Sequence, residues 1–212
     1  EISDDDAFSS GPQTPAGGTR CPPRARGCAM LTNAPTLHTS RLTLRGPVKD
    51  DLAPFTAWVT TSDRMASVGG NGSENDAWRG FIAGIGHWQW HGFGFFTITD
   101  THTDAPLGRC GLLRHAVWPE TELAYHLFDG AEGRGIAYEA AVAVRHWAGD
   151  SLGLSPLASF ISPDNTRSLS LAKRLSARRD REDTIEGDPV LVHRHLAHTN
   201  PLAQAQYTEV TA

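Results

Sequence analysis

The chain has 212 residues, of which 39% are hydrophobic and 20% are charged, and its formal net charge is −5. This balance indicates one soluble globular domain with short tails, and the negative charge gives no support to nucleic-acid or anionic-membrane binding. No apolar run approaches the ~20 residues that span a bilayer, and an odd set of three cysteines favours a reducing, cytoplasmic compartment over a disulfide framework.

Both ends of the chain are predicted to be flexible tails. Residues 1–33 are rich in Pro, Gly, Ser and Thr, and their start, "EISDDDAFSSGPQ", lacks the apolar core of a secretory signal. Met30 directly precedes the first folded-looking segment, which leaves open whether the residues before it are native. Cys21 and Cys28 lack a second ligand pair at zinc-site spacing and are interpreted as tail thiols. Residues 198–212 are predicted to be a second tail, so that 34–197 form a single domain.

The first half of this domain contains a strand and two helices. Residues 40–47, "SRLTLRGP", alternate apolar and polar side chains as a half-buried strand does. Helical spacing of apolar residues follows in 50–61. After a loop, Ser73 with Asp76 three residues later forms a capping-box pattern. The helix that it opens has an apolar face and is predicted to end near His91 and Gly92.

The second half alternates strands with helices. Strands are predicted at 93–100, 107–114, 121–129, 155–162 and 188–197, the first two as a hairpin. One helix is predicted from Ile136 with Gly149 as a C-cap, and another over 166–175. The order of elements predicts a mixed sheet flanked by helices.

A glycine cluster stands between the third of these strands and the helix from Ile136, in the segment "DGAEGRGIAYEAAVAVRHWAG". Gly133 and Gly135 let the main chain turn sharply, Ala137 keeps the first helical turn open, and Arg134 offers a charge-assisted bond. The unpaired N–H groups of a helix start bind phosphate well. The pattern is neither a P-loop nor G-x-G-x-x-G, so by itself an empty glycine-rich turn explains it equally well.

Four segments together resemble the GNAT superfamily of acyl-CoA-dependent N-acyltransferases, in particular its Rim-type branch. They are "TSRLTLRGPVKDDL", "GRCGLLR", "TELAYHLFDGAEGRGIAYEAA" and "SPDNTRSLSLAKRL", which come in the family's order and spacing between about Pro35 and Leu196. The resemblance implies a mixed α/β (α+β) fold whose mostly antiparallel sheet of six to seven strands is splayed at the cofactor site. It implies acetyl-CoA as co-substrate without a metal, a primary amine as acceptor, and a homodimer.

The resemblance also implies roles for individual residues. Main-chain groups of the turn would bind the coenzyme A pyrophosphate, and the end of the preceding strand would bind the pantetheine amides. Asn165 would lie against the pantetheine arm, Ser168 near the thioester sulfur, and Glu122 opposite the acceptor amine. The expected cofactor-binding residues are Leu127, Phe128, Gly133, Arg134, Gly135, Ile136, Ala137, Asn165 and Ser168, and the expected catalytic residues are Glu122 and Ser168.

The chain departs from the family pattern at three places. Glu132 occupies the first position of the pyrophosphate motif, where a carboxylate opposes an anion. Ala124 replaces the glycine of the "E-x-Gly-Tyr" pattern that contains Glu122. Ser176 and Ala177 follow the last helix where the family has glycine and then phenylalanine or alanine, which could change the turn into the final strand.

Several side chains have competing interpretations. His126 shares a strand face with Glu122 and is a second candidate base, although a structural histidine is the favoured interpretation. Cys110 is interpreted as a core thiol and Trp88 as a core aromatic, while Trp90 and Trp118 are candidates for the wall of an acceptor pocket. His193 and His195 share a strand face at metal-pair spacing without a third ligand, so they are interpreted as solvated.

The leading hypothesis is N-acetylation by direct attack of an amine in a ternary complex with acetyl-CoA. A non-catalytic module that binds coenzyme A or another anion is the alternative, and Glu132 and Ala124 favour it. A nucleotide-using transferase is weaker, because no acid pair for magnesium is evident. Ribosomal N-termini, free amino acids, polyamines and aminoglycosides all fit as acceptors, and the choice depends on residues 61–72 and 115–121.

Overall fold

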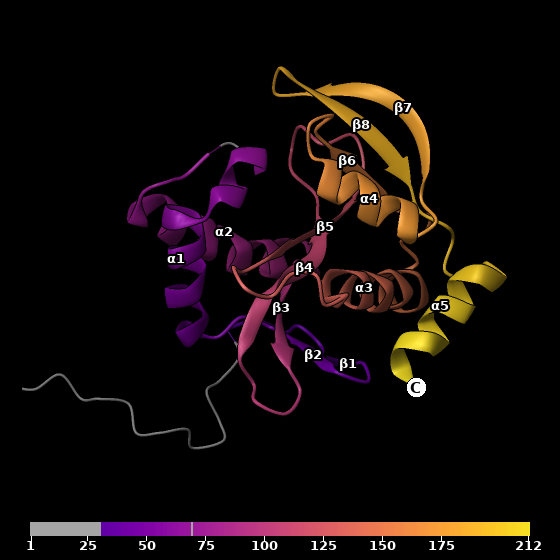
Figure 1. Ribbon diagram of the computed structural model, residues 1–212, viewed down its shortest axis with the longest axis horizontal. Helices are drawn as coiled ribbons and strands as arrows, with labels where there is room; N and C mark the ends of the chain where they lie inside the picture. Colours follow the sequence, from indigo (N-terminus) through magenta and orange to yellow (C-terminus); the bar gives the residue numbers. More distant parts are fainter. Residues whose placement is uncertain (1–30, 69) are drawn as a thin grey trace, which may run out of the picture.

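The computed structural model describes residues 31–68 and 70–212, which form one curved sheet with helices on both faces (Figure 1). The strands are β1 (Leu37–His38), β2 (Leu42–Arg45), β3 (Phe95–Asp100), β4 (Pro106–Leu113), β5 (Glu122–Leu127), β6 (Ala158–Ile161), β7 (Arg178–Ile185) and β8 (Asp188–Arg194). The α-helices are α1 (Leu52–Thr61), α2 (Glu74–His91), α3 (Ile136–Leu152), α4 (Thr166–Arg174) and α5 (Pro201–Thr211), with short 3-10 helices η1 (Lys49–Asp51) and η2 (Asp63–Val68).

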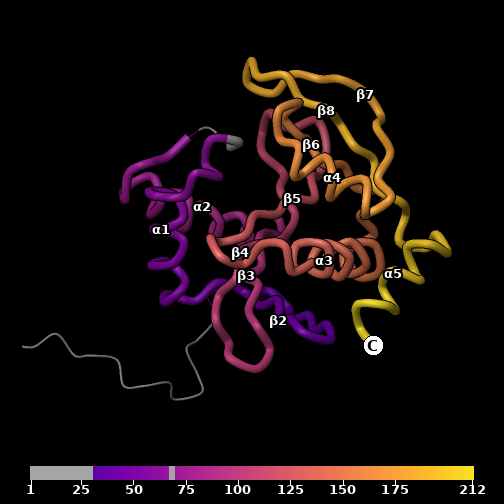
Figure 2. Tube along the Cα trace, in the orientation of Figure 1, coloured from indigo at the N-terminus to yellow at the C-terminus, as the bar shows by residue number. Residues whose placement is uncertain are grey.

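The sheet has the strand order β1-β2-β3-β4-β5-β6-β8-β7. Every neighbouring pair is antiparallel except β5 and β6, which are parallel and joined through α3. Figure 2 shows this connection, in which the chain leaves β5, runs through α3 and returns along β6. The parallel pair matches at one position, Glu122 opposite Ala158, so the two strands separate beyond it. The expected mixed, mostly antiparallel and splayed sheet is therefore confirmed.

Local signals set the limits of the helices that the sequence predicted well. The Ser73 hydroxyl accepts from the Asp76 N–H at 3.2 Å and the Asp76 carboxylate accepts from the Ser73 N–H at 2.9 Å, which confirms the capping box before α2. Gly92 ends the helix in the left-handed conformation with φ 73°. Asn165 caps α4 by accepting a bond from the Ser168 N–H.

Two apolar clusters hold the layers together. The larger cluster lies between the sheet and α3 and contains Leu44, Phe96, Leu123 and Val144, all fully buried. The smaller cluster joins α1 and α2 to the other face of the sheet, through side chains such as Phe55. Because β5 lies between the two clusters, its alternate side chains face α1 and α2 on one side and α3 and α4 on the other.

The sheet has eight strands where six to seven were expected. The additional strands are β1, which has two residues, and β7, which escaped notice because its sequence "RRDREDTI" is nearly all polar. β7 lies at the edge of the sheet and pairs along its length with β8. Charged side chains on an edge strand oppose pairing with other chains, so its composition suits its position even though it hides the strand.

The two predicted tails differ from what the structure shows at their inner ends. Residues 198–212 were expected to be a tail, but most of them form α5, which begins with Asn200 as N-cap and Pro201 in the first turn. At the other end, the Leu31 N–H donates to the Pro47 carbonyl at 3.0 Å, so residues 31–33 already belong to the fold. The tail before residue 31, including both of its cysteines, lies outside the described residues.

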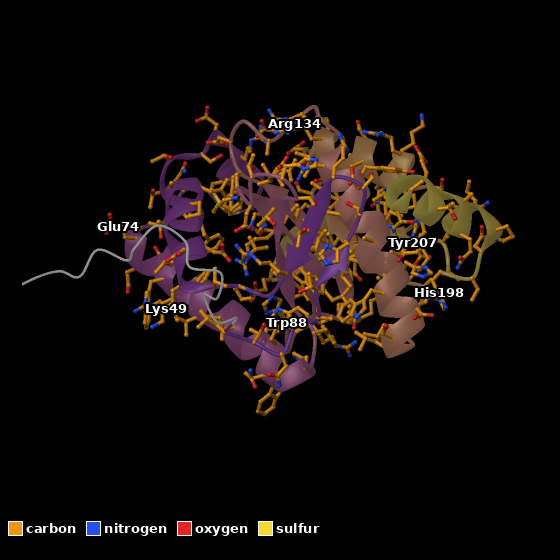
Figure 3. The ribbon with its side chains drawn as sticks, turned by 90° about the horizontal axis from the view of Figure 1, so that it is seen from below. Lys49, Glu74, Trp88, Arg134, His198 and Tyr207 are labelled. Atoms are coloured by element: carbon orange, nitrogen blue, oxygen red, sulfur yellow. The ribbon has the colours of Figure 1, made fainter. Side chains whose placement is uncertain are left out.

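The C-terminal helix packs on α3 at the point where a helix end was wrongly predicted. α3 continues through Gly149 and ends at Leu152, with Gly153 as its C-cap at φ 66°. A β-carbon at Gly149 would lie 2.2 Å from the His198 ring, so this glycine serves close packing rather than capping. Tyr207 of α5 stacks on His146 of α3 at 3.7 Å, and Figure 3 shows Tyr207 and His198 beside each other at this end of the molecule.

Candidate active site

A cleft of ≈ 330 Å³ lies where β5 and β6 separate. One wall is the glycine turn with the start of α3, and the other wall is the start and exposed face of α4. The β5 side chains Tyr125, His126 and Leu127 lie between these walls. In Figure 1, α3 and α4 lie next to each other beside β5 and β6. The cleft thus combines a helix N-terminus with the splayed strands that the sequence analysis expected.

The start of α3 has the features of an anion site. Gly133 and Gly135 both have left-handed backbone conformations, with φ values of 69° and 78°. No side chain caps the helix at Gly135, and the first intrahelical bond is donated by Glu139, so the N–H groups ahead of it are open to the cleft. A β-carbon at Gly133 would meet nothing within 4 Å, which leaves room for a ligand against the main chain. These residues fit a phosphate group.

Arg41 from the β1–β2 turn fixes the outer side of this turn. Its guanidinium donates to the Arg134 carbonyl at 3.1 Å and pairs with the buried carboxylate of Glu139. The Arg134 side chain does not line the cleft and lies at the edge of the molecule in Figure 3. The predicted contribution of Arg134 is therefore limited, in this conformation, to its main chain.

The carboxylate of Glu132, which the sequence placed in conflict with a bound anion, has a cationic partner. It pairs with the Arg64 guanidinium from η2 and accepts from the Gly130 N–H at 3.0 Å. Both Glu132 and Arg64 line the cleft. The pairing offsets the negative charge beside the glycine turn, so this departure from the family pattern is compensated by a residue far away in sequence.

The opposite wall carries polar and basic groups on α4. Asn165 Oδ1 accepts from the Ser168 N–H at 3.1 Å, which fixes the first turn of α4, and both residues line the cleft. Arg167 and Arg174 line the same wall, and the Arg174 guanidinium lies over the Tyr138 ring at 4.9 Å. Cations on this wall and helix amides on the other create a cleft suited to an elongated anionic ligand.

Glu122 lies at the closed end of the splay, where β5 and β6 still pair, and is not part of the cleft lining. It is buried, with 8% of its surface exposed. Oε1 accepts from the Phe160 N–H at 3.1 Å and Oε2 accepts from Trp118 Nε1–H at 2.9 Å. Burial raises the pKa of Glu122 to about 7, although the two hydrogen bonds act in the opposite direction. Such a carboxylate is partly protonated at neutral pH, as general bases often are.

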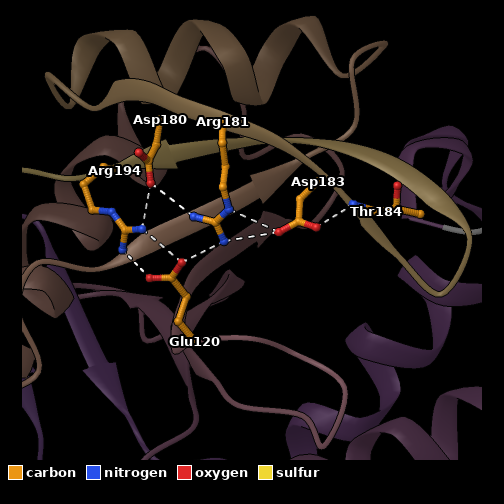
Figure 4. A network of polar contacts seen from close by, with 6 residues as sticks. All are labelled: Glu120, Asp180, Arg181, Asp183, Thr184 and Arg194. Atoms are coloured by element: carbon orange, nitrogen blue, oxygen red, sulfur yellow. Dashed lines mark hydrogen bonds and ion pairs between the residues drawn. The ribbon is translucent and has the colours of Figure 1, made fainter.

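An ion-pair network holds the loop that carries Trp118. Arg194 of β8 and Arg181 of β7 both pair with Glu120, and Arg194 also pairs with Asp180 at 2.8 Å (Figure 4). The hydrogen bond from Arg194 lowers the pKa of Glu120 most, and the hydrogen bond from Arg181 and the charges of both arginines lower it further. Glu120 is two residues from Trp118 and from Glu122, so the β7–β8 hairpin supports the position of both.

His126 does not resemble a free base. Its ring stacks on Trp58 of α1 at 4.2 Å with an interplanar angle of 13°. Burial, with a further contribution from Arg109, holds the pKa of His126 well below its ordinary value, so the imidazole is neutral. Its Nε2 is buried and has no hydrogen-bond partner among the residues that the structure describes.

The remaining sequence interpretations have mixed outcomes. Cys110 is fully buried and burial raises the pKa of its thiol, and Trp88 is a core residue, both as expected. Trp90 is 86% exposed and does not line the cleft. His195 was wrongly interpreted as solvated: it is 2% exposed, lies 3.0 Å from the Ser159 hydroxyl, and burial lowers its pKa to about 3. Within residues 31–68 and 70–212, no group of three or more potential ligands could hold a metal ion.

The structure brings most of the predicted site residues together. Those that line the cleft are Leu127, Gly133, Gly135, Ile136, Ala137, Asn165 and Ser168. Phe128, Arg134 and Glu122 lie outside this lining, and Phe128 is buried next to Trp58. Among the lining residues that sequence reasoning missed, Trp58 and Arg64 come from α1 and η2, whereas Tyr125, Tyr138, Arg167 and Arg174 lie on the same elements as the predicted residues. Arg167 and Arg174 had a detectable signal, since they are seven residues apart on one helix face.

None of the helices in the described part of the chain has the length and apolar character needed to cross a membrane. The family described as an acetyltransferase (GNAT) domain matches residues 41–178.

Three solved structures are similar to this chain. An acetyltransferase from Agrobacterium tumefaciens str. C58 is 35% identical, with coverage of 76% of this chain and 94% of that chain and a TM-score of 0.71. A putative ribosomal-protein-serine acetyltransferase from Vibrio cholerae is 19% identical, with coverage of 78% and 99% and a TM-score of 0.65. An aminoglycoside acetyltransferase in complex with coenzyme A is 14% identical, with coverage of 79% and 99% and a TM-score of 0.64. The last two show a shared fold.

Proposed function

Because the chain belongs to the GNAT acetyltransferase family, we propose that it transfers an acetyl group from acetyl-CoA to a primary amine by direct attack within a ternary complex. One observation carries this proposal. Open helix amides, a hydroxyl-bearing helix turn and two separating strands line a single cleft, and a buried carboxylate with a raised pKa lies outside this lining, where the two strands still pair.

The residues that would hold coenzyme A are those of the two walls. The amides of Gly135, Ile136 and Ala137 suit the pyrophosphate, and the β5 main chain near Leu127 and Phe128 suits the pantetheine amides. Asn165 caps α4 and thereby fixes the first turn of this helix, which would lie against the pantetheine arm. When bound, acetyl-CoA supplies an activated acyl group as a thioester.

Glu122 is proposed to accept the proton of the attacking amine. An ionised carboxylate has about four lone-pair positions, and the two hydrogen bonds from Trp118 and Phe160 leave others for a further donor. With a pKa of about 7, about half of the Glu122 carboxylates are ionised at neutral pH. The proton affinity of Glu122 is also closer to that of an amine than the affinity of an ordinary carboxylate is. The base therefore acts from the closed end of the splay toward the cleft.

Ser168 is proposed to stabilise the departing sulfur. Its N–H is engaged by Asn165 and its carbonyl accepts from the Tyr125 hydroxyl at 3.4 Å, so its hydroxyl is the group that remains for a ligand. A thiol with a pKa near ~8.5 is a good leaving group and needs only a weak donor. The Ser168 contribution is therefore expected to be smaller than that of Glu122.

The test is release of free thiol from acetyl-CoA with a panel of primary amines, together with direct calorimetric binding of coenzyme A. We expect turnover by the native protein, loss of ~10²–10⁴-fold in kcat for Glu122→Gln, and a smaller loss for Ser168→Ala. Tight coenzyme binding without turnover on a broad panel would support the non-catalytic module instead. The Arg64–Glu132 pair removes one of the two sequence features that favoured that module.

A further inference from the structure

The sheet face below α1 carries buried side-chain nitrogens that lack a hydrogen-bond partner in the described part of the chain. Trp58 Nε1 and His126 Nε2 are both buried without a partner among the described residues. The two rings stack at 4.2 Å and both line the cleft. Trp58 is 7% exposed and lines the cleft, so a group that enters the cleft can satisfy its N–H.

Arg109 adds a buried positive charge directly beside this pair. It is opposite His126 in the β4–β5 register, on the same face of the sheet, and is 6% exposed. Its guanidinium lies between two aromatic rings, 4.6 Å from the centroid of Phe55 and 4.7 Å from that of Phe95. Burial lowers the pKa of this guanidinium, and the charge of Asp51 acts in the opposite direction.

Asp51 is already committed to other donors. Its carboxylate accepts two bonds from Arg45 at 2.7 and 2.9 Å, one from the Val48 N–H at 2.9 Å and one from the Thr97 hydroxyl at 2.8 Å. Arg109 is therefore held by aromatic faces, which attract a cation but accept no N–H bond of ordinary strength. The α2 backbone is shaped around it, because a β-carbon at Gly84 would lie 2.6 Å from Arg109 Nη2.

The chemistry of the missing partner follows from the groups present. An indole nitrogen and a guanidinium only donate, and a neutral imidazole donates from one of its nitrogens. An acceptor that carries negative charge satisfies unpaired N–H groups and is attracted to a nearby buried cation. A cationic ligand would face Arg109 across one strand spacing in a low-dielectric region, where repulsion is strong.

We propose that Trp58, His126 and Arg109, here called the donor cluster, form the acceptor subsite and that the acceptor is a small amine bearing a carboxylate, such as a free amino acid. This inference rests on the proposed acetyltransferase function and narrows its acceptor. Trp58 and His126 would contact the carboxylate, and Arg109 behind them would supply the opposite charge. Polyamines and aminoglycosides, which are cationic, are excluded as preferred acceptors.

The position of the cluster also sets a length. Glu122 and His126 are four residues apart on one strand, so the carboxylate subsite lies roughly 13 Å along the strand from the Cα of the proposed base. Part of that distance is spanned by the Glu122 and His126 side chains. The best amine-to-carboxylate spacing is thus an experimental variable, and unbranched ω-amino acids of increasing length sample it directly.

The experiment compares kcat/KM for glycine, β-alanine, 4-aminobutyrate and 6-aminohexanoate with their carboxamides and with diamines of matched length. We expect at least a tenfold preference for one or more carboxylates over the matched amide. In Arg109→Met, the ratio of kcat/KM for the carboxylate to kcat/KM for the matched amide should fall to about two or less. Arg79→Met, which removes an exposed arginine on α2, should leave it unchanged. Equal preference in native protein and Arg109→Met, or a preference for diamines, overturns the inference while the transferase proposal stands.

Binding provides a second readout that does not need turnover. The N-acetylated form of each carboxylate, with coenzyme A present, should raise the melting temperature of the native protein more than the N-acetylated amide does. Arg109→Met should abolish that difference. If that variant does not fold, Trp58→Phe, which keeps an aromatic ring and removes the N–H, should lower the carboxylate preference at least threefold. Absence of both effects in folded variants overturns the inference, even if no acceptor supports turnover.

Discussion

The Trp118 indole N–H donates a 2.9 Å hydrogen bond to Oε2 of Glu122, four residues later in the chain. This bond favours the ionised carboxylate, whereas burial favours the protonated form and is the larger effect. The pKa of Glu122, about 7, therefore reflects two opposing influences, and removing the weaker one moves it in a known direction.

Trp118→Phe should raise the pKa of Glu122 further, because it removes a donor to the charged form and leaves the burial. We expect the acidic limb of kcat/KM to move to higher pH by about one unit, the scale of one hydrogen bond to a charged group. The measurement is a pH profile of thiol release. Trp90→Phe, at a position that is 86% exposed, is the matched control and should leave the profile in place. An unchanged profile in Trp118→Phe would show that Glu122 does not set that limb.

Glu122→Gln should change the pH dependence of stability. The folded-state pKa is raised from 4.5 to about 7, so the stability that the protonated carboxyl contributes is full below pH 4.5 and is lost as the pH rises through about 7. Relative to the native protein, the glutamine variant should gain on the order of 3 kcal/mol in unfolding free energy between pH 4.5 and 8. Urea unfolding at several pH values measures this, and a difference that stays constant with pH would contradict the buried, raised-pKa carboxylate.

Gly135→Ala and Gly153→Ala form a matched pair at the two ends of α3. Both glycines have left-handed φ values, 78° and 66°, so alanine should cost about 1–2 kcal/mol of stability at either position. At Gly135 the substitution also disturbs the amides that face the cleft. We expect weaker coenzyme A binding by calorimetry for Gly135→Ala only. Equal affinity in the two variants would place the pyrophosphate elsewhere.

Arg64→Met should weaken coenzyme A binding, because it leaves Glu132 uncompensated beside the glycine turn. Glu132→Gln alone should change binding little, and the double variant should recover most of the loss, with a coupling of about 1 kcal/mol. Calorimetric titration of the four proteins with coenzyme A gives the coupling directly. Additive effects would mean that Arg64 acts by contacting the ligand and not by pairing with Glu132.

Elements with periodic apolar faces or recognisable caps were predictable from sequence. The capping box at Ser73, the cap at Asn165 and the strands around the glycine turn lie where expected. β7 was missed because edge strands need little apolar surface, and α5 because helical propensity and an Asn-Pro start are weak signals beside a polar composition. The family's glycine after α4 is replaced by Ser176, which still adopts φ 60°.

The residues of the candidate site also fall into a group that the sequence could predict and a group that it could not. The glycine turn and the first turn of α4 are contiguous in sequence, so their residues could be named in advance. Trp58 and Arg64 line the cleft only because α1 and η2 pack near the end of β5, and that proximity is a property of the tertiary structure. Compensation of Glu132 by Arg64, 68 positions earlier in the chain, has no local signature.

The docking of α5 has a practical consequence for making this protein. Gln206 accepts a 2.6 Å bond from the buried Arg145 guanidinium, whose other arm donates to the Leu175 carbonyl. Removal of the residues after 197 would leave the Arg145 guanidinium without its Gln206 acceptor and would expose the face of α3 on which α5 packs.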